Sequence, residues 1–359
     1  MSIKEITHKL MGLFKPRSTH KYKVKSKEEL LDIIYMNIEE KGFFCDLNYL
    51  DVSEIRDFSY LFSYSEFNGD ISEWNVSRAT NMQNMFYGSK FNGDISRWNV
   101  SHVTDMSSMF ERSEFNQNIS SWNVSQVNTM NKMFYKSQIN ARIFCLRGNA
   151  IRDLSHMFAF SKFNGFIGDW NTSTVEDMTG MFMNSNFQGK ISGWDVSGCR
   201  SMSCMFMNSY FNSDLSKWNV SNVTNMNYMF YGSSFTQDIS AWDISNVESL
   251  RCMLTSSYPK EKLKNWNLQG KDCFELYESK SIIFDYEHLA DVLLDWFSYH
   301  TKEYPKEYVS FSIFARLNSK IYKIDISNSY FDEENWLIKL EPLSEEFIKA
   351  LFDAAGKKK

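Results

Sequence analysis

Aspartates recur at a fixed spacing in this sequence, and stacked carboxylates could hold a calcium ion. They lie multiples of 24 residues apart and are Asp46, Asp70, Asp94, Asp214 and Asp238. In the middle of the chain the same column reads Asn118, Arg142, Phe166 and Lys190. Because the carboxylate row is broken there, turns in which each aspartate accepts a hydrogen bond from its own backbone explain the column better than a metal site does. We therefore predict no metal and no other cofactor.

Asparagines form a second column with the same spacing. It reads Asn75, Asn99, Asn123, Asn171 and Asn219, with Asp195 and Asp243 as substitutes. The Asn-Val-Ser triplets in it are glycosylation sequons, which matter only in a glycosylating secretory compartment. A side chain that recurs on every unit cannot distinguish one ligand region from another. We predict a ladder of side-chain amides between neighbouring units in preference to a binding site.

Residues that could act as catalysts are not grouped by this spacing. The histidines fall in different columns and are His8, His20, His102, His156, His288 and His300. The six cysteines show no C-x-x-C spacing, and no glycine-rich phosphate loop occurs. We predict a protein that is not an enzyme and has no catalytic residues.

An internal repeat of 24 residues must position all of these side chains. Its most visible members are Trp74, Trp98, Trp122, Trp170, Trp194, Trp218, Trp242 and Trp266. In the unit that contains residues 91–110, Trp98 and Val100 alternate as in a strand, whereas Met106, Met109 and Phe110 have the spacing of a helix. Each unit is therefore predicted to contain a strand and a short helix.

Two further columns support the predicted helix. The first holds only side chains that cap helix N-termini and reads Asp57, Asn81, Asp105, Thr129, Asp153, Asp177, Ser201, Asn225 and Ser249. The second follows the helix and reads Ser65, Ser89, Ser113, Ser137, Ser161, Ser185, Ser209, Ser233 and Ser257. We predict that these serines hydrogen-bond to the neighbouring unit, and that the Asn-Gly of F-N-G-D forms a turn.

The repeat predicts an α/β solenoid, similar to leucine-rich repeats, with about ten coils over residues 43–270. Residues 1–42 comprise a basic amphipathic segment and a capping helix that begins at Ser26, ends at Gly42 and buries Leu30, Ile33, Ile34 and Ile38. Residues 271–359 lack the period and are predicted to form a small α+β domain. It would contain a strand and a helix, a hairpin that turns at Asn318 and Ser319, and a final helix.

The N-terminal segment and the net charge limit the kinds of partner. Residues 3–14 could lie on an anionic membrane as a short basic helix, but so few apolar residues favour docking or fraying over membrane contact. With 39 basic and 44 acidic residues the net charge is −5, which argues against nucleic acid. No secretory signal peptide is recognisable, so we expect a cytoplasmic protein with reduced thiols.

Recognition should involve exposed columns whose residues differ from unit to unit. The column before the tryptophan includes Glu73, Arg97, Asp169 and Lys217, and the column at the predicted helix exit includes Tyr87, Tyr135 and Tyr231. One irregular unit, residues 139–151, has Leu146 in place of tryptophan and carries Arg142 and Arg147. A degenerate repeat explains that unit better than a dedicated site, and the variable columns are equally compatible with recognition and with sequence drift.

The unit F-N-G-D-I-S-x-W-N-V-S-x-V-T-x-M-x-x-M-F resembles the BspA-like, leucine-rich-repeat-related surface proteins of bacteria, in the subgroup with this W-N-V-S pattern. The resemblance covers residues 43 to about 270. It implies a right-handed solenoid and a role in adhesion or protein binding, without a catalytic centre. Those proteins usually carry export or anchor signals, which this chain does not show.

The sequence therefore predicts a non-enzymatic scaffold that binds a protein partner through the variable columns. Its partner and its oligomeric state are not indicated. Two alternatives remain: an adhesin or effector that reaches the cell surface or a host by a non-classical route, and a scaffold that carries a catalytic or toxin-like C-terminal module.

Overall fold

The structure, a computed structural model, describes residues 21–148, 150–255, 258–273 and 276, and the backbone of five strands between residues 282 and 339. The chain divides into two compact units, Met1–Glu278 and Ser279–Lys359. The predicted segment 3–14, Ser257, the hairpin turn at residues 318–319 and both C-terminal helices lie outside the described residues. No helix within the described ranges is long and apolar enough to cross a membrane.

The described part of the first unit begins with a short strand and a helix. Strand β1 (Tyr22–Lys23) pairs in parallel with β2 (Leu50–Asp51), and α2 (Lys27–Lys41) lies between them in sequence. The Ser26 side chain accepts a hydrogen bond from the Glu29 amide, and the Gly42 amide donates to the Ile38 carbonyl. Leu30, Ile33 and Ile34 are buried, so the predicted capping helix is confirmed, while Ile38 is only partly buried.

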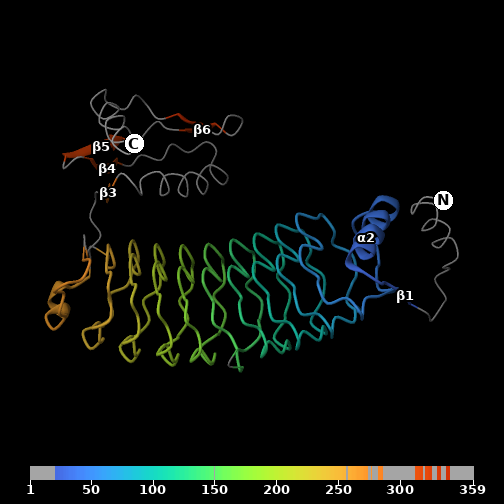
Figure 1. Cartoon of the computed structure of the whole chain (residues 1–359), viewed down its shortest axis with the longest axis horizontal. Helices are drawn as coiled ribbons and strands as arrows, with labels where there is room; N and C mark the ends of the chain where they lie inside the picture. The colour runs from blue at the N-terminus through green and yellow to red at the C-terminus, as the bar shows by residue number, and fades with distance from the viewer. Residues whose placement is uncertain are drawn as a thin grey trace, which may run out of the picture. The chain divides into compact units, whose positions relative to one another are not determined.

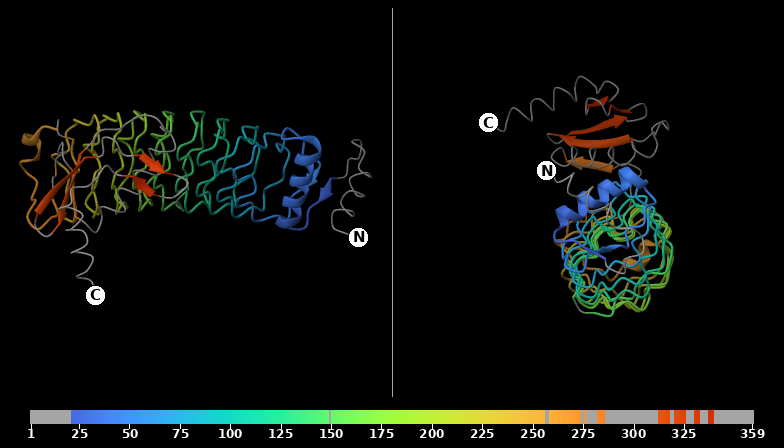
Figure 2. Two further views of the ribbon diagram at one scale, coloured as in Figure 1. Left: turned by 90° about the horizontal axis from the view of Figure 1, so that it is seen from above. Right: turned by 90° about the vertical axis from the view of Figure 1, so that its right-hand side faces the viewer.

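Successive 24-residue coils stack along the rest of this unit (Figures 1 and 2). Neighbouring coils are joined by parallel backbone bridges that run in one column through Asp57, Asn81, Asp105, Thr129, Asp153, Asp177, Ser201, Asn225, Ser249 and Asp272. The pairing thus continues past residue 270. A 3-10 helix, η1 (Lys260–Leu263), lies in the last coil.

The strand predicted in each coil is present as β2 in the first coil and is wrong for the other described coils. The short helix predicted in each coil is wrong for the described residues, where turns occupy its place. In the coil of Asp105, the amides of Met109 and Glu111 donate to carbonyls three residues earlier, which closes two turns. The amides of Ser108 and Phe110, which alternate with them along the chain, donate to carbonyls of the next coil. Because alternate amides leave the coil, the i to i−4 bonds of an α-helix cannot form.

This ribbon of turns repeats two positions at which φ is positive. The first column reads Tyr60, Asn84, Ser108, Lys132, His156, Gly180, Cys204, Tyr228 and Cys252. The second reads Tyr64, Gly88, Arg112, Lys136, Phe160, Asn184, Asn208 and Gly232. None of these residues is β-branched, in keeping with the crowding that a branched Cβ meets in this region. The left-handed positions are a property of the repeat, since most of them are not glycine.

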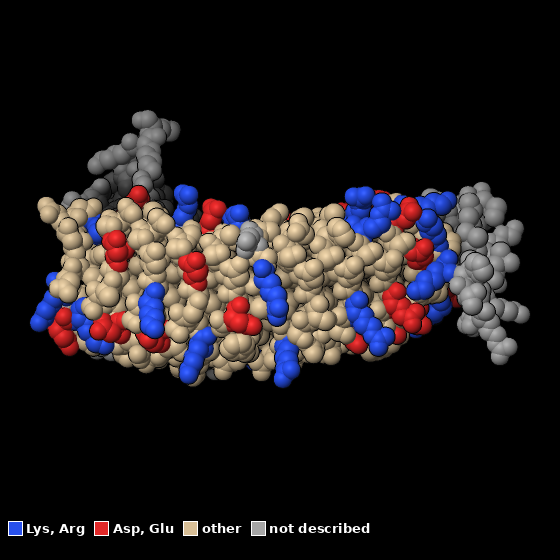
Figure 3. Space-filling model, turned by 90° about the horizontal axis from the view of Figure 1, so that it is seen from below, with Lys and Arg blue, Asp and Glu red and all other residues tan. Residues whose placement is uncertain are grey.

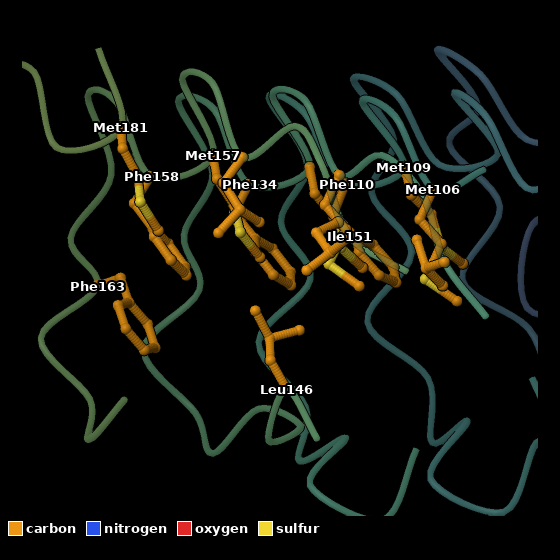
Figure 4. Packing of buried hydrophobic residues seen from close by; sticks show 14 of the residues in the cluster. Met106, Met109, Phe110, Phe134, Leu146, Ile151, Met157, Phe158, Phe163 and Met181 are labelled. Atoms are coloured by element: carbon orange, nitrogen blue, oxygen red, sulfur yellow. The ribbon is translucent and has the colours of Figure 1, made fainter. Parts of the chain in front are cut away.

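The core consists of aromatic and aliphatic side chains stacked from coil to coil. Phe86 and Phe110 lie 5.5 Å apart between ring centroids and are nearly parallel, and Trp194 and Trp218 lie 6.4 Å apart. Figure 4 shows Phe110, Phe134 and Phe158 in equivalent places of consecutive coils, with Leu146 pointing into the same interior from another wall. The repeated tryptophan, valine, methionine and phenylalanine side chains, such as Trp98, Val100 and Phe110, are buried in the described coils.

The tryptophans of the column from Trp74 to Trp242 also join coils through their indoles, whereas Nε1 of Trp266 has no hydrogen-bond partner among the described residues. The Nε1 group of Trp98 donates to the Ile71 carbonyl at 3.2 Å, and that of Trp122 donates to the Ile95 carbonyl at 3.0 Å. The indole therefore has its hydrogen bond inside the core, which a buried polar group requires.

In the second unit the structure describes strands only. Strands β3 (Ile282–Asp285), β4 (Ser312–Leu317) and β5 (Lys320–Asp325) form one sheet, and β6 (Tyr330–Asp332) pairs with β7 (Leu337–Lys339). The β4 and β5 strands are antiparallel with Leu317 opposite Lys320, which is the register of the predicted hairpin.

Candidate binding surface

The aspartate column forms local turns. The Oδ1 atom of Asp70 accepts a hydrogen bond from the Ser72 amide at 2.9 Å, and Asp214 does the same for Ser216 at 2.8 Å. Backbone donation to these carboxylates lowers the pKa of both aspartates. The predicted aspartate turn is confirmed. Within the described residues, no three His, Cys, Asp or Glu side chains are grouped as metal ligands.

The amide ladder predicted for the Asn75 column is wrong. Asn75 and Asn99 are exposed, and each side chain accepts from the amide two residues later in its own coil, at 3.2 and 3.1 Å. The ladder between coils is made instead by the asparagine of F-N-G-D: the Asn92 amide donates to Asn68 Oδ1, and the Asn116 amide donates to Asn92 Oδ1. Both columns contain asparagine, so residue type could not separate the two roles.

The serine column is also local. The Oγ of Ser113 donates to the Phe110 carbonyl at 2.9 Å and accepts from the Phe115 amide. Contact with the neighbouring coil comes from backbone carbonyls, because the Glu114 amide donates to the Ser89 carbonyl. The predicted link between coils exists, but the serine side chain does not make it.

The variable column before the tryptophan lies on the surface. Glu73, Arg97, Asp169 and Lys217 are all exposed. Lys21 lies 3.8 Å from Glu73, whereas no ion pair within 4 Å joins Arg97, Asp169 or Lys217 to another described residue. On the face seen in Figure 3, the surface is made mainly of uncharged residues, with basic and acidic side chains scattered along its middle and grouped together towards the right-hand end of the view.

The second variable column is less accessible than the first. Tyr87, Tyr135 and Tyr231 are half-buried, and Glu111 in the same column is buried. The Tyr87 ring packs edge-on against Tyr64 at 4.9 Å. Burial and a hydrogen bond with Tyr64 raise the pKa of the Tyr87 phenol. These tyrosines therefore pack within the outer ribbon as well as facing solvent.

Around Tyr135 the outer ribbon is basic and aromatic. The Nζ atoms of Lys132 and Lys136 lie 5.8 and 5.7 Å from the centre of the Tyr135 ring, and Phe160 meets that ring edge-on at 5.4 Å. The half-buried His156 ring lies 6.5 Å from the Tyr135 ring between centroids, and its Nδ1 has no hydrogen-bond partner among the described residues. Burial lowers the pKa of His156, which keeps the ring neutral.

The irregular coil keeps its core while it changes its surface. Leu146 is buried in the place of tryptophan, and Phe144 stacks on Trp170 at 6.1 Å. A Cβ on Gly148 would lie 2.5 Å from the Ser125 carbonyl oxygen, so only glycine allows the two backbones this close. Arg142 and Arg147 are exposed on this coil.

One exposed residue was not selected from the sequence. Phe166 occupies the aspartate column and leaves 76% of its surface exposed. Its sequence signal is the replacement of aspartate by phenylalanine in that column, which argued only against a calcium site.

A family described as "Mycoplasma protein of unknown function, DUF285" matches residues 31–145 and 152–266, more than half of the chain. The chain belongs to this family. The unmatched residues 146–151 fall in the irregular coil, so the coil stack comprises two tandem copies of the family's repeat region, of bacterial origin, that meet there. No curated protein and no solved structure matches the sequence.

Proposed function

We propose that this protein is a non-enzymatic solenoid scaffold, related to the W-N-V-S subgroup of BspA-like repeats, that binds a protein partner through the exposed column of Glu73, Arg97, Asp169 and Lys217. Its coils are ribbons of turns in place of the strand-and-helix units of leucine-rich repeats. The observation that carries the proposal is the contrast between columns. Interior columns repeat the same residue types, while this exposed column carries both charges in an order that does not repeat.

A rigid scaffold suits recognition by an extended surface. Backbone hydrogen bonds and stacked rings join each coil to the next, so exposed side chains one coil apart are held in fixed order. Binding to a preorganised surface avoids part of the entropy cost of ordering mobile groups. The net charge of −5 favours a protein over a nucleic acid as the partner.

Capture of partners from a native lysate by the full chain tests the proposal. The charge-reversed variant R97E/D169K/K217E is expected to lose partners that the original chain retains. The matched control K90E/E66K/K162E makes the same net change of charge in another exposed column and should retain them. Equal capture by both variants and by the original chain would show that this column does not bind the partner.

A further inference from the structure

The aspartate column changes character in three consecutive coils. Where most other coils carry aspartate, these coils carry Arg142, Phe166 and Lys190. All three side chains are exposed, and Phe166 at 76% is among the most exposed large apolar residues of the described chain. Two cations therefore flank an uncovered aromatic ring, each one coil away from it.

These three residues cannot form the local turn that aspartate forms in this column. Aspartate accepts the amide two residues later, as Asp94 does for Ser96 at 2.9 Å. Arginine, phenylalanine and lysine have no side-chain acceptor and cannot form that turn. Loss of a repeated local hydrogen bond in three adjacent coils needs a compensating reason, since such turns stabilise the backbone.

The surroundings of Phe166 have changed with it. Most other coils have serine two residues after the column, whereas this coil has Gly168 and the coil of Arg142 has Phe144. A Cβ on Gly168 would lie 3.2 Å from the Phe166 ring and 2.6 Å from the Lys190 carbonyl oxygen. The ring therefore lies beside the backbone at Gly168, next to the coil of Lys190, where a serine side chain would collide with its surroundings. A ring held in this way is preorganised for contact with a partner, which avoids part of the entropy cost of binding.

Charge along the column defines the extent of this surface. On the N-terminal side of Arg142 the next residue of the column is the neutral Asn118, followed by Asp94. On the C-terminal side of Lys190 the next residue is Asp214. An anionic ligand would be attracted to the middle coils and repelled on both sides of them. Complementary charge of this kind fixes the register of a partner more than it adds raw affinity.

We propose that Arg142, Phe166 and Lys190 bind a short acidic protein segment in which an apolar side chain lies between two carboxylates. In an extended segment alternate side chains point the same way and lie about 6.6–6.8 Å apart. Equivalent rings in adjacent coils lie between 5.5 Å apart, for Phe86 and Phe110, and 6.5 Å apart, for Trp218 and Trp242. The carboxylates pair with Arg142 and Lys190, and the apolar side chain packs on Phe166. The proposal rests on the proposed scaffold function. It adds a second site, in a different column from Arg97 and Lys217, and states the chemistry of the partner segment that this site binds.

Three substitutions test the site because each restores the aspartate of the column. R142D, F166D and K190D should preserve folding, since aspartate forms the local turn in the other coils. The probe is a labelled pentapeptide Glu-Ser-Leu-Ser-Glu, which in an extended conformation places leucine between two glutamates on one face. It is titrated with the full chain by fluorescence anisotropy at low and high salt. Comparison probes are the lysine–leucine peptide Lys-Ser-Leu-Ser-Lys and a labelled oligothymidylate.

The original chain is expected to bind the glutamate–leucine peptide more tightly than either comparison probe, and less tightly at high salt. R142D/K190D and F166D should each weaken binding by about tenfold or more, a loss typical of a central contact, without lowering the melting temperature. The matched control R56D/R78D makes the same charge change at two exposed arginines outside both proposed surfaces and should bind the peptide as the original chain does.

Three outcomes would overturn the site: no binding by the original chain, equal binding by R142D/K190D, or preferential binding of oligothymidylate that the same variant loses. The last result would identify a single-stranded nucleic acid site. If lysate capture depends on Arg97, Asp169 and Lys217 while the peptide result is negative, the scaffold function stands and only this site fails.

Discussion

At the scale of single residues, the outer ribbon depends on backbone conformations that most side chains avoid. Left-handed conformations cost a non-glycine residue roughly 1–2 kcal/mol. The structure repeats them twice per coil, mainly at residues other than glycine. This conformational cost is offset by the backbone hydrogen bonds that alternate amides form with carbonyls of the next coil.

Tyr60 offers a test of this conformation, because its φ is 59° and its side chain is mostly exposed. Tyr60→Gly and Tyr60→Ala both remove the ring, so their difference reports the backbone. We expect the glycine variant to be more stable by about 1 kcal/mol in urea unfolding. A helix would give the opposite order by about 1 kcal/mol, and Glu39 in α2 provides that control. Higher stability of Tyr60→Ala would contradict the turn.

His156 should make stability depend on pH. Burial, with a smaller contribution from Lys132, lowers its pKa below the ordinary value of 6.5, while Asp177 and Asp153 oppose the shift. Above pH 6.5 the ring is neutral in both states. As the pH falls below 6.5 the unfolded chain binds a proton that the folded chain does not, so stability is lost.

The variant His156→Gln should remove this part of the pH dependence. Urea unfolding at pH 7.5 and 5.5 measures it: the free energy of unfolding should fall less for the variant than for the original chain. An identical fall in the two proteins would show that His156 does not contribute.

At the scale of the coil, the 24-residue period and the interior columns could be predicted from the sequence because burial imposes the same residue types on every coil. The helix could not be excluded, since Met106, Met109 and Phe110 have a spacing that an apolar ribbon of turns also satisfies. Asp105 was correctly identified as the acceptor for a nearby amide, here that of Ser107. This hydrogen bond lies at the start of the ribbon of turns and not at the start of a helix. The difference depends on backbone hydrogen bonds to the next coil, which the spacing of residues within one coil cannot predict.

The column of Asn116 is expected to matter more than that of Asn99. The Oδ1 atom of Asn116 accepts from the amides of Asn140 and Ala141 in the next coil. Asn116→Ala should cost about 1 kcal/mol, because two donors lose their acceptor. Asn99→Ala removes only a local, exposed bond and should cost about 0.5 kcal/mol or less. Chemical denaturation of both variants decides between the columns, and a larger cost at Asn99 would restore the ladder first predicted there.

The binding columns were the least predictable part of the coil. Exposure of Arg97 and Lys217 followed from their position beside a buried tryptophan, but the half-buried packing of Tyr87 did not. That packing depends on Tyr64 in the preceding coil, 23 residues earlier. The importance of Phe166 was missed for a related reason, because one substitution within a column has no meaning until the neighbouring coils are placed beside it.

At the scale of the stacked coils, stability should be transmitted between neighbours. Ile34 of α2 is 4% exposed and packs in the same core as the first coils. Ile34→Ala should cost about 2–5 kcal/mol. In an array of nearest-neighbour contacts the loss should be greatest next to the change.

Hydrogen exchange followed by mass spectrometry measures this gradient. Protection should fall most in residues 43–90 and remain close to the original in residues 190–250. A uniform loss of protection along the stack would show that the coils unfold as a single cooperative body.

The direction of the bonds between coils has a consequence for assembly. The amides of Met106, Ser108 and Phe110 all donate towards the next coil. In this ribbon, one end of the stack consequently presents carbonyl groups and the other presents N–H groups. Two bare ends would be complementary, and head-to-tail contacts of this kind do not close but extend into filaments. Lys27, which hydrogen-bonds to Asp57 and Ser59 of the first coil, helps α2 to occupy one of these ends. By lying at this end, α2 is expected to oppose such head-to-tail association as well as to cover the core.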